Sequence, residues 1–427
     1  MPPTKSPVDR DSVIETFAAH LSRPKVEFYQ RYGFDLVMGK REGIFFEDLD
    51  GRRLINAHCN GGVFNMGHRH PALVSALKQA LDSLDIGNHH LISTYRAQLA
   101  QRLTASIPGD IDHLVFASSG GEAIDMAIKM ARGFTQRPRI LSAQGGYHGH
   151  TGLAMATGDP RYRDPFGPSI PGFQQVPFLD LDALEQALDS SVAAVILETI
   201  PATLGIVVPT AAYLQGVRRL CDRYGCLLIL DEIQSGLGRT GKMWAFEHFD
   251  ISPDIVVTGK GLSGGLYPIA ATCFRGSMER LFEADPFVHI STFGGAELGC
   301  VVSLALLDIL ESTGFLQHIT ETGEQINAAL SEFSSRYSEV LVGIRQLGMM
   351  IGLVFARPGL GVLFSRVLLD HGIFAVYSNN DKRVTQFLLP LIIQPHEVQD
   401  VLERLRLSLE AIQQPEMREM AALIETL

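Results

Sequence analysis

Apolar residues occur along the chain in two alternating patterns. Short runs of consecutive apolar residues, bounded by glycine or polar residues, alternate with longer stretches in which apolar positions recur at helical spacing. From Pro71 onward, this alternation predicts an α/β fold with a mostly parallel sheet covered by helices and with ligands at the carboxyl ends of the strands. The runs predicted as strands are 114–118, 140–143, 192–197, 227–230 and 255–257.

The pattern changes beyond about Leu310. Long amphipathic stretches predict helices over 319–333 and 396–409, around short strands such as 350–355. We therefore expect a large domain and a smaller α+β domain. The predicted division assigns residues 66–310 to the large domain and 311–427 to the small domain, to which residues 1–65 also contribute.

The N-terminal part contains a hairpin signal. Residues 44–55 are apolar on both sides of Asp50 and Gly51, a pair that favours a tight turn between two strands. The first ten residues include three prolines, so we expect them to form a loose tail.

Composition limits the function classes. The chain has 427 residues, 46% of them hydrophobic, and a formal net charge of −11 at pH 7. This hydrophobic content is enough for a large core. The net charge is negative, whereas nucleic-acid-binding proteins usually carry a basic surface. No apolar stretch reaches the length of a membrane span, and the N-terminus has no secretory signal. We expect neither nucleic acid nor a membrane as a partner.

The cysteines are scattered without a CxxC pair or a metal-ligand spacing. This arrangement predicts reduced thiols, no metal site and, by default, a cytoplasmic protein. The five positions are Cys59, Cys221, Cys226, Cys273 and Cys300.

One lysine directly follows an apolar strand. Lys260 lies in the run from Asp254 to Gly265, with a glycine on each side. Burying an ammonium group costs free energy unless the amine is neutral, paired or covalently linked, and desolvation lowers its pKa. Such an amine is the nucleophile that a Schiff base requires. A solvent-facing lysine is the simpler interpretation of an isolated Gly-Lys-Gly sequence.

A second apolar run ends in two acids. Successive side chains of a strand point to opposite sides, so at most one of Asp231 and Glu232 faces a site at the strand end. A buried carboxylate needs a cationic or hydrogen-bonding partner, and a protonated pyridine nitrogen would be one. A helix N-cap is the alternative interpretation of Asp231 alone.

A third element joins a strand to a helix. Residues 114–116 have a strand pattern and residues 123–131 a helical one, so residues 118–121 form the turn. Free N–H groups and the positive end of the helix dipole favour a phosphate there, and glycines allow its close approach. Ser-Gly is also ordinary turn chemistry.

Together with further motifs, these elements resemble the class III (omega-type) aminotransferases, which are pyridoxal-phosphate-dependent enzymes of fold type I. The resemblance implies a mostly parallel, seven-stranded-type sheet sandwiched by helices, with a smaller α+β domain. Its motifs cover most of the chain in one order and lie at 43–51, 64–71, 118–123, 145–151, 230–241, 254–265 and 289–295.

The resemblance implies roles around the ring of pyridoxal 5'-phosphate. Lys260 would form the Schiff base and move the proton of the substrate carbon, while Asp231 would keep the ring nitrogen protonated. Tyr147 would stack on the ring, His148 belongs to the same motif, and Gln234 would bind near the ring hydroxyl.

The remaining matches concern the phosphate and the subunit partner. Ser119, Gly120 and Gly121 would bind the phosphate, and Glu198 is a further cofactor-site residue. Thr292 matches a threonine that reaches the phosphate of the partner subunit, so the resemblance implies a homodimer with shared active sites.

Two departures from the family pattern concern substrate recognition. Members that bind an α-carboxylate carry an arginine before a Pro-Pro-Leu segment and a glutamate that pairs with it, where this chain has Gln386 and Thr203. A glutamine lacks the bidentate cationic fork for a carboxylate, so we do not expect an ornithine-type or dicarboxylate pocket. Glu297 adds a negative charge that either favours a cationic amine or caps the following helix.

We therefore predict an aminotransferase that moves an amino group from a primary (omega-type) amine or amino acid to a keto acid. The acceptor needs a cation, for which Arg96, Arg161 and Arg163 are candidates. The alternative is an ammonia-lyase or racemase of the same family, acting on an amine with a phosphate, phosphonate or other non-carboxylate group.

Two features have competing interpretations. His89 and His90 lie in a stretch that enters the partner's substrate pocket in the resembling family, or they belong to an ordinary turn. Trp244 follows a glycine-rich turn, and we expect it to pack in the core.

Overall fold

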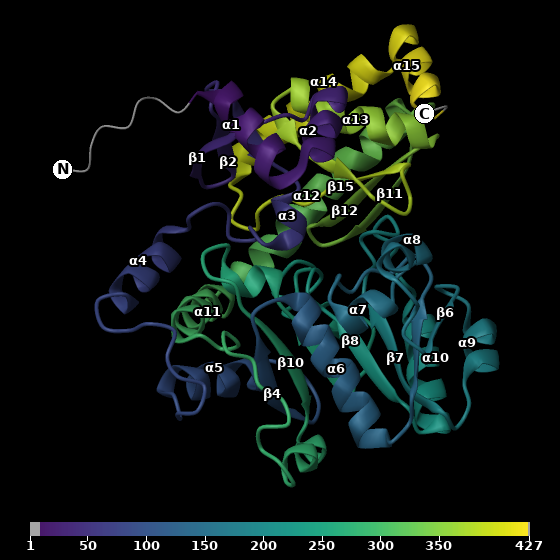
Figure 1. Cartoon of the computed structure of the whole chain (residues 1–427). Helices are drawn as coiled ribbons and strands as arrows, with labels where there is room; N and C mark the ends of the chain where they lie inside the picture. The colour runs from purple at the N-terminus through teal and green to yellow at the C-terminus, as the bar shows by residue number, and fades with distance from the viewer. Residues whose placement is uncertain (1–8, 426–427) are drawn as a thin grey trace.

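The larger sheet of the computed structural model, which describes residues 9–425, has seven strands (Figure 1). Among the described strands of this sheet, β10 alone runs antiparallel to its neighbours. The predicted α/β class with a mostly parallel sheet is therefore confirmed. In spatial order the strands are β4 (Ile111–Ala117), β10 (Ala270–Arg275), β9 (Ile255–Thr258), β8 (Leu227–Asp231), β7 (Val192–Glu198), β5 (Arg139–Ala143) and β6 (Phe173–Val176).

Helices cover both faces of this sheet. On β7, Ile196 joins the core cluster of α6, whereas Val195 and Leu197 join the cluster that contains α10. Because every residue of β7 is buried, the strand is a continuous apolar run until its final glutamate. The helices around the sheet are α4 (Pro71–Ala80), α5 (Thr94–Ala105), α6 (Gly120–Thr135), α7 (Gly152–Ala156), α8 (Pro160–Arg163), α9 (Leu181–Ala187), α10 (Ala211–Tyr224) and α11 (Glu297–Leu310).

The N-terminal and C-terminal segments lie together above the large sheet (Figure 1). Strand β3 of the N-terminal part pairs in parallel with β13 of the C-terminal part. The four-stranded sheets are β1 (Met38–Glu42), β2 (Phe45–Asp48), β3 (Arg53–Asn56) and β13 (Ile373–Phe374), and β11 (Leu341–Leu347), β12 (Met350–Phe355), β15 (Val384–Phe387) and β14 (Val376–Tyr377). The helices are α1 (Arg10–Phe17), α2 (Arg23–Tyr32), α12 (Phe315–Arg336), α13 (Pro358–Asp370), α14 (Pro395–Ile412) and α15 (Pro415–Glu425).

Most predicted elements are confirmed, including the hairpin, which β2 and β3 form as an antiparallel pair. Two strands of the large sheet were not predicted. Strand β6 lies at the sheet edge, where half-exposed polar residues interrupt its apolar pattern. Strand β10 runs antiparallel after β9 and has no intervening long helix to mark it. The predicted domain boundaries stay a prediction, which the β3–β13 pairing favours.

The expectation for the first ten residues is wrong at its C-terminal end. The side chain of Asp9 accepts a hydrogen bond from the Ser12 N–H and caps α1, which begins at Arg10. Residues 1–8 lie outside the described residues. Within residues 9–425, no single helix has the length and apolar content to cross a membrane, although the bent pair α11–α12 meets those two criteria.

Candidate active site

The sheet topology brings three ionisable residues to its carboxyl edge. Glu198 and Asp231 end the adjacent parallel strands β7 and β8 and are register partners. Asp231 is also the register partner of Val257 on β9. Lys260 follows the end of β9 after one intervening residue. The predicted location of the site at the carboxyl ends of the strands therefore agrees with this clustering.

The Lys260 amine lies in a narrow, partly buried space. Its Nζ donates a hydrogen bond to Gln234 Oε1 at 2.9 Å. A Cβ atom added to Gly61 would lie 3.1 Å from the same Nζ, so a larger residue there would crowd the amine. Burial lowers the pKa of Lys260, against the opposing charges of Asp231 and Glu198. The lowered pKa favours the neutral, nucleophilic amine.

Asp231 is paired with a buried histidine. Its Oδ2 lies 2.8 Å from His148 Nδ1, and its Oδ1 accepts a hydrogen bond from the Ile233 N–H at 3.0 Å. Burial works against protonation of His148, but the hydrogen bond and charge of Asp231 outweigh it and raise the pKa of His148. The aspartate thus favours the protonated form of this buried imidazole.

Glu198 links the site to the turn that carries Tyr147. The Tyr147 N–H donates to Glu198 Oε1 at 2.8 Å. Burial raises the pKa of Glu198 to about 7; the charge of His148 opposes this shift and that of Asp231 adds to it. The protonation state of this carboxyl group therefore changes near neutral pH.

Glu232 points away from this cluster, as the alternation of side chains along a strand requires. Its carboxylate accepts from the hydroxyls of Thr199 and Ser235 and from the N–H groups of Ala245 and Phe246. Burial raises the pKa of Glu232 to about 7, against these four hydrogen bonds. Glu232 holds the loop after β8, so of these two neighbouring acids only Asp231 faces the site.

The strand-to-helix turn has the predicted form. Ser119 caps α6 by accepting a hydrogen bond from the Glu122 N–H at 3.3 Å. Glu122 in turn accepts from the Ser118 N–H at 2.8 Å and from its hydroxyl at 2.6 Å. A Cβ atom added to Gly121 would lie 2.9 Å from Thr151 Oγ1, so this turn packs closely on the start of α7. Glu122 was not singled out from the sequence.

The residues predicted to act across a subunit boundary lie elsewhere. Thr292 is exposed, and among the described residues no hydrogen bond joins it to the Lys260 cluster, which comprises Lys260, Gln234, Asp231, His148 and Glu198. His89 and His90 stack on each other, and His90 also contacts the ring of Phe287, with centroids 5.4 Å apart. Trp244 is fully buried and donates from Nε1 to the Ser106 carbonyl, which confirms its packing role.

The two substituted positions of the family pattern are neighbours. Gln386 is buried on β15 and its Nε2 donates to the Ala202 carbonyl at 3.3 Å. Thr203, which follows Ala202 in the chain, donates from Oγ1 to the Gly145 carbonyl at 3.1 Å. A neutral pair therefore stands where an arginine and a glutamate would face each other.

His58 is a site-adjacent residue that sequence reasoning missed. It is half-buried, and burial lowers its pKa to about 4, with a further contribution from the charge of Lys260. Cys59, Asn60, Gly61 and Gly62 follow it with φ angles of 51°, 49°, 65° and 101°. The polar residues directly after the predicted hairpin were the available signal for this left-handed turn beside Lys260.

Comparisons with known proteins point to one family. The class-III aminotransferase family profile matches residues 29–409. An uncharacterised aminotransferase from Archaeoglobus fulgidus is 52% identical over 96% of each chain. Putrescine aminotransferase from Pectobacterium atrosepticum is 34% identical over 84% of this chain and 80% of the relative.

A solved structure extends the similarity to the fold. Taurine:2-oxoglutarate aminotransferase from Bifidobacterium kashiwanohense, solved with pyridoxal phosphate and glutamate, has a TM-score of 0.82. It is 27% identical, over 88% of this chain and 93% of its own. These relatives transfer amino groups, so the lyase or racemase alternative is not favoured. The chain belongs to the class III aminotransferases, which are pyridoxal-phosphate-dependent enzymes.

Proposed function

We propose that this aminotransferase moves an amino group from a primary, omega-type amine to a keto acid, with Lys260 holding pyridoxal phosphate through a Schiff base. The observation that carries the proposal is the position of the Lys260 amine, 2.9 Å from Gln234 Oε1 and within the electrostatic influence of Asp231 and Glu198. Desolvation of this amine favours the form that attacks a carbonyl carbon.

The polar groups around Lys260 fit this cofactor. Gln234 Nε2 and His148 Nε2 are buried and have no hydrogen-bond partner among the described residues. Unpaired buried polar atoms cost free energy unless a ligand satisfies them. Gln234 would accordingly bind the ring hydroxyl, and Asp231, supported by His148, would hold the protonated ring nitrogen.

Three further contacts would complete the cofactor site. The start of α6, with Ser119, Gly120 and Gly121, would hold the phosphate through backbone N–H groups and the helix dipole. Tyr147 would cover the face of the ring. Glu198 holds the Tyr147 backbone and would contribute its carboxyl group to the same site.

Bound pyridoxal phosphate supplies an electron sink that makes the proton on the amine-bearing carbon removable. The Lys260 amine would take up that proton and return it, because its lowered pKa makes the neutral form available. The carboxylate of Asp231, held by His148 and the Ile233 N–H, would maintain a negative charge opposite the ring nitrogen.

The neutral residues at the family's carboxylate-binding position favour an amine without an α-carboxylate. Gln386 and Thr203 bond to backbone carbonyls and offer no cation to such a donor. The relative named for putrescine, a diamine, supports this donor class. The structure named for taurine and 2-oxoglutarate, which contains glutamate, supports a keto acid as acceptor.

We also propose a cytoplasmic homodimer in which Thr292 completes the partner's site. The loops around residues 86–92 and 284–293 meet through His90 and Phe287. Contiguous exposed apolar residues of this kind favour a protein interface. The exposed apolar residues on the two loops are Leu91, Ile92, Phe287, Val288, Ile290 and Phe293.

A panel of amines tests the donor class. The purified protein, saturated with pyridoxal phosphate, would be mixed with aliphatic diamines, monoamines and α-amino acids, first alone and then with pyruvate or 2-oxoglutarate. We expect primary amines to convert the cofactor to its pyridoxamine form and to yield the amino acid once the keto acid is added. Exclusive use of α-amino acids, or ammonia release without an acceptor, would contradict the proposal.

A further inference from the structure

The acceptor half of the reaction lacks an evident cation. A keto acid carries a carboxylate that a guanidinium recognises well, whereas Gln386 offers only an amide that is already bonded to the Ala202 carbonyl. The inference below rests on the proposed function and names the residue that supplies this cation. The three arginines singled out from the sequence have different surroundings.

Arg96 is committed to the backbone. Its guanidinium donates to the carbonyl oxygens of Gly295 at 2.7 Å, Asn88 at 3.0 Å and Ile86 at 3.4 Å. It therefore fastens the loop before α5 to the loop before α11. Because Nε, Nη1 and Nη2 all donate to the backbone, this guanidinium is not available to a substrate.

Arg163 is also committed, although more loosely. Its Nε lies 3.3 Å from Asp164 Oδ1, so a neighbouring carboxylate already balances its charge. Arg161, on the same short helix α8, has no carboxylate within ion-pair distance among the described residues.

The Arg161 guanidinium is positioned by neutral groups only. It lies over the ring of Tyr162, with 4.5 Å between the guanidinium carbon and the ring centroid. It also donates to the Asn379 carbonyl at 3.2 Å, to the side-chain oxygen of Asn380 and to the Tyr162 hydroxyl. These three bonds all come from Nη2, and the side chain is exposed, so the guanidinium is held in place while Nε and Nη1 remain open to a ligand.

Ring contacts connect this guanidinium to the candidate active site. The Tyr162 ring lies 6.5 Å from the ring of Tyr147 and 5.3 Å from that of His150, between centroids. The Tyr147 N–H is bonded to Glu198, the buried acid at the end of β7. Contacts therefore lead from Arg161 through Tyr162 to Tyr147, whose backbone N–H is bonded to the site acid Glu198.

The same guanidinium is tied to the substituted carboxylate-binding position. Asn380, which accepts from Arg161, donates its backbone N–H to the Thr203 carbonyl at 2.9 Å. Its Nδ2 donates to the Gly145 carbonyl at 2.7 Å, which also accepts from the Thr203 hydroxyl. One hydrogen-bonded unit therefore joins Arg161 to the residue that replaces the glutamate of the family pattern.

We propose that Arg161 is the specificity residue that binds the carboxylate of the keto acid acceptor. The guanidinium provides the charge, and the Tyr162 hydroxyl provides a neighbouring donor for the same carboxylate. The cation has moved from a buried strand position, where Gln386 now stands, to an exposed position on α8. Donor amines without a carboxylate do not depend on it.

A direct measurement of keto acid binding tests this proposal. The holoenzyme would be titrated with 2-oxoglutarate and pyruvate by calorimetry, for the unchanged protein and for Arg161→Gln, Arg161→Lys and Arg163→Gln. We expect Arg161→Gln to weaken binding of both keto acids at least about tenfold, since a charge-assisted contact is lost. Arg161→Lys keeps the positive charge but lacks the planar guanidinium, so we expect its keto acid affinity to lie between that of the unchanged protein and that of Arg161→Gln. Arg163→Gln is the matched control on the same helix.

Amine affinity shows whether Arg161 recognises the keto acid or only anchors the loop that contains Asn379 and Asn380. In Arg161→Gln, the loss of keto acid affinity is expected to exceed any loss of amine affinity by at least about tenfold. Equal losses for amine and keto acid would overturn the proposal, because they would indicate a displaced Asn379–Asn380 loop. Unchanged keto acid binding in Arg161→Gln would overturn it as well. Keto acid binding to the unchanged protein does not require a reactive amine, so failure of the proposed donor class leaves this measurement intact.

Discussion

Two buried aspartates mark opposite ends of the central strands. Asp254 directly precedes β9 at the amino edge of the sheet, whereas Asp231 is the last residue of β8 at the carboxyl edge. Their exposed fractions are similarly small, 2% and 5%. Their partners differ in kind, and that difference distinguishes a structural acid from one suited to chemistry.

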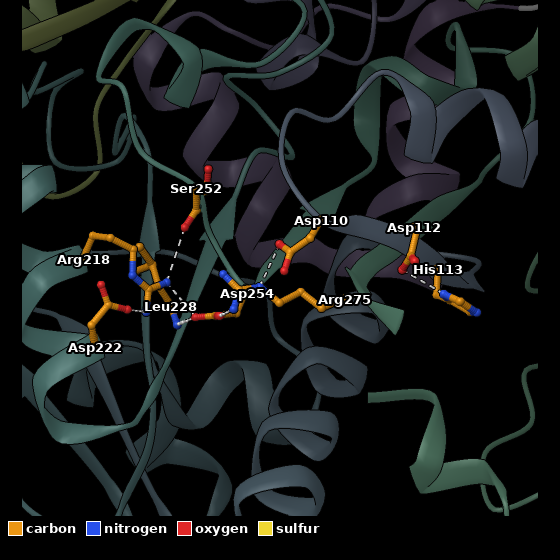
Figure 2. A network of polar contacts seen from close by, with 9 residues as sticks. All are labelled: Asp110, Asp112, His113, Arg218, Asp222, Leu228, Ser252, Asp254 and Arg275. Atoms are coloured by element: carbon orange, nitrogen blue, oxygen red, sulfur yellow. Dashed lines mark hydrogen bonds and ion pairs between the residues drawn. The ribbon is translucent and has the colours of Figure 1, made fainter. Parts of the chain in front are cut away.

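Asp254 is surrounded by groups of permanent charge (Figure 2). Arg218 lies 2.7 Å from Oδ2 and Arg275 2.9 Å from Oδ1, and the Leu228 N–H also donates to Oδ2. A guanidinium stays protonated throughout the ordinary pH range. The network therefore joins α10, β8 and β10 with charges that do not change.

Asp231 has titratable neighbours instead. Its ion-pair partner is His148, and the nearby Lys260 and Glu198 have pKa values shifted towards neutrality by burial. Burial alone does not identify a catalytic acid, since Asp254 is also buried. The distinguishing property is a set of partners whose protonation can change during a reaction.

Replacing Lys260 at the carboxyl edge of the sheet should cause the largest loss of activity. Lys260→Ala removes the group that holds the cofactor and the group that moves the proton, so we expect kcat to fall by roughly three orders of magnitude or more. Amino acid formation from an amine and a keto acid measures the effect. Lys78→Ala, at an exposed position on α4, is the control. Near-normal turnover in Lys260→Ala would refute the assignment.

Neutralising the structural aspartate should instead affect stability. Asp254→Asn leaves Arg218 and Arg275 without their shared buried counter-charge, and we expect a loss of about 3 kcal/mol in the free energy of unfolding. Asp222→Asn is the matched control, because Asp222 pairs with Arg218 at the exposed surface, and it should cost less than about 1 kcal/mol. Denaturant titration measures both, and equal losses would erase the contrast.

The reciprocal substitution sharpens the comparison. Asp231→Asn removes the charge that faces His148, and we expect kcat/KM to fall by about a hundredfold because the ring nitrogen loses its anionic partner. Activity of Asp254→Asn, normalised to folded protein, should stay near that of the unchanged enzyme. A similar loss of activity in the two variants would mean that the two edges do not differ in function.

The smallest expected effect is a pH dependence. Glu198 titrates at a pKa of about 7 in the folded chain, above the ordinary value of 4.5. The folded state therefore binds more protons than the unfolded state between these pH values, and stability falls as pH rises through this window. Glu198→Gln should remove that contribution, on the order of 1 to 3 kcal/mol, from the cofactor-free protein. Identical stability-versus-pH curves for the two proteins would exclude this role.

Much of this protein could be predicted from local sequence. Buried parallel strands are continuous apolar runs, and an acid or lysine at the end of such a run is conspicuous, so Asp231 and Lys260 could be singled out as candidates without coordinates. The alternation rule also predicted that Asp231 and Glu232 would separate. Strands β6 and β10 escaped prediction because an edge strand and an antiparallel neighbour carry weaker patterns.

Only the tertiary structure decided which distant groups meet. The pairing of Asp231 with His148, the contact between Lys260 and Gln234, and the left-handed turn after His58 depend on strand order and loop packing. The same holds for the arginines, which are equivalent as letters in the chain. Hydrogen bonds to backbone carbonyls engage all three guanidinium nitrogens of Arg96, whereas the hydrogen bonds of Arg161 to described residues all come from Nη2. A residue's type determines the chemistry it can perform, but its partners in space determine whether that chemistry is available.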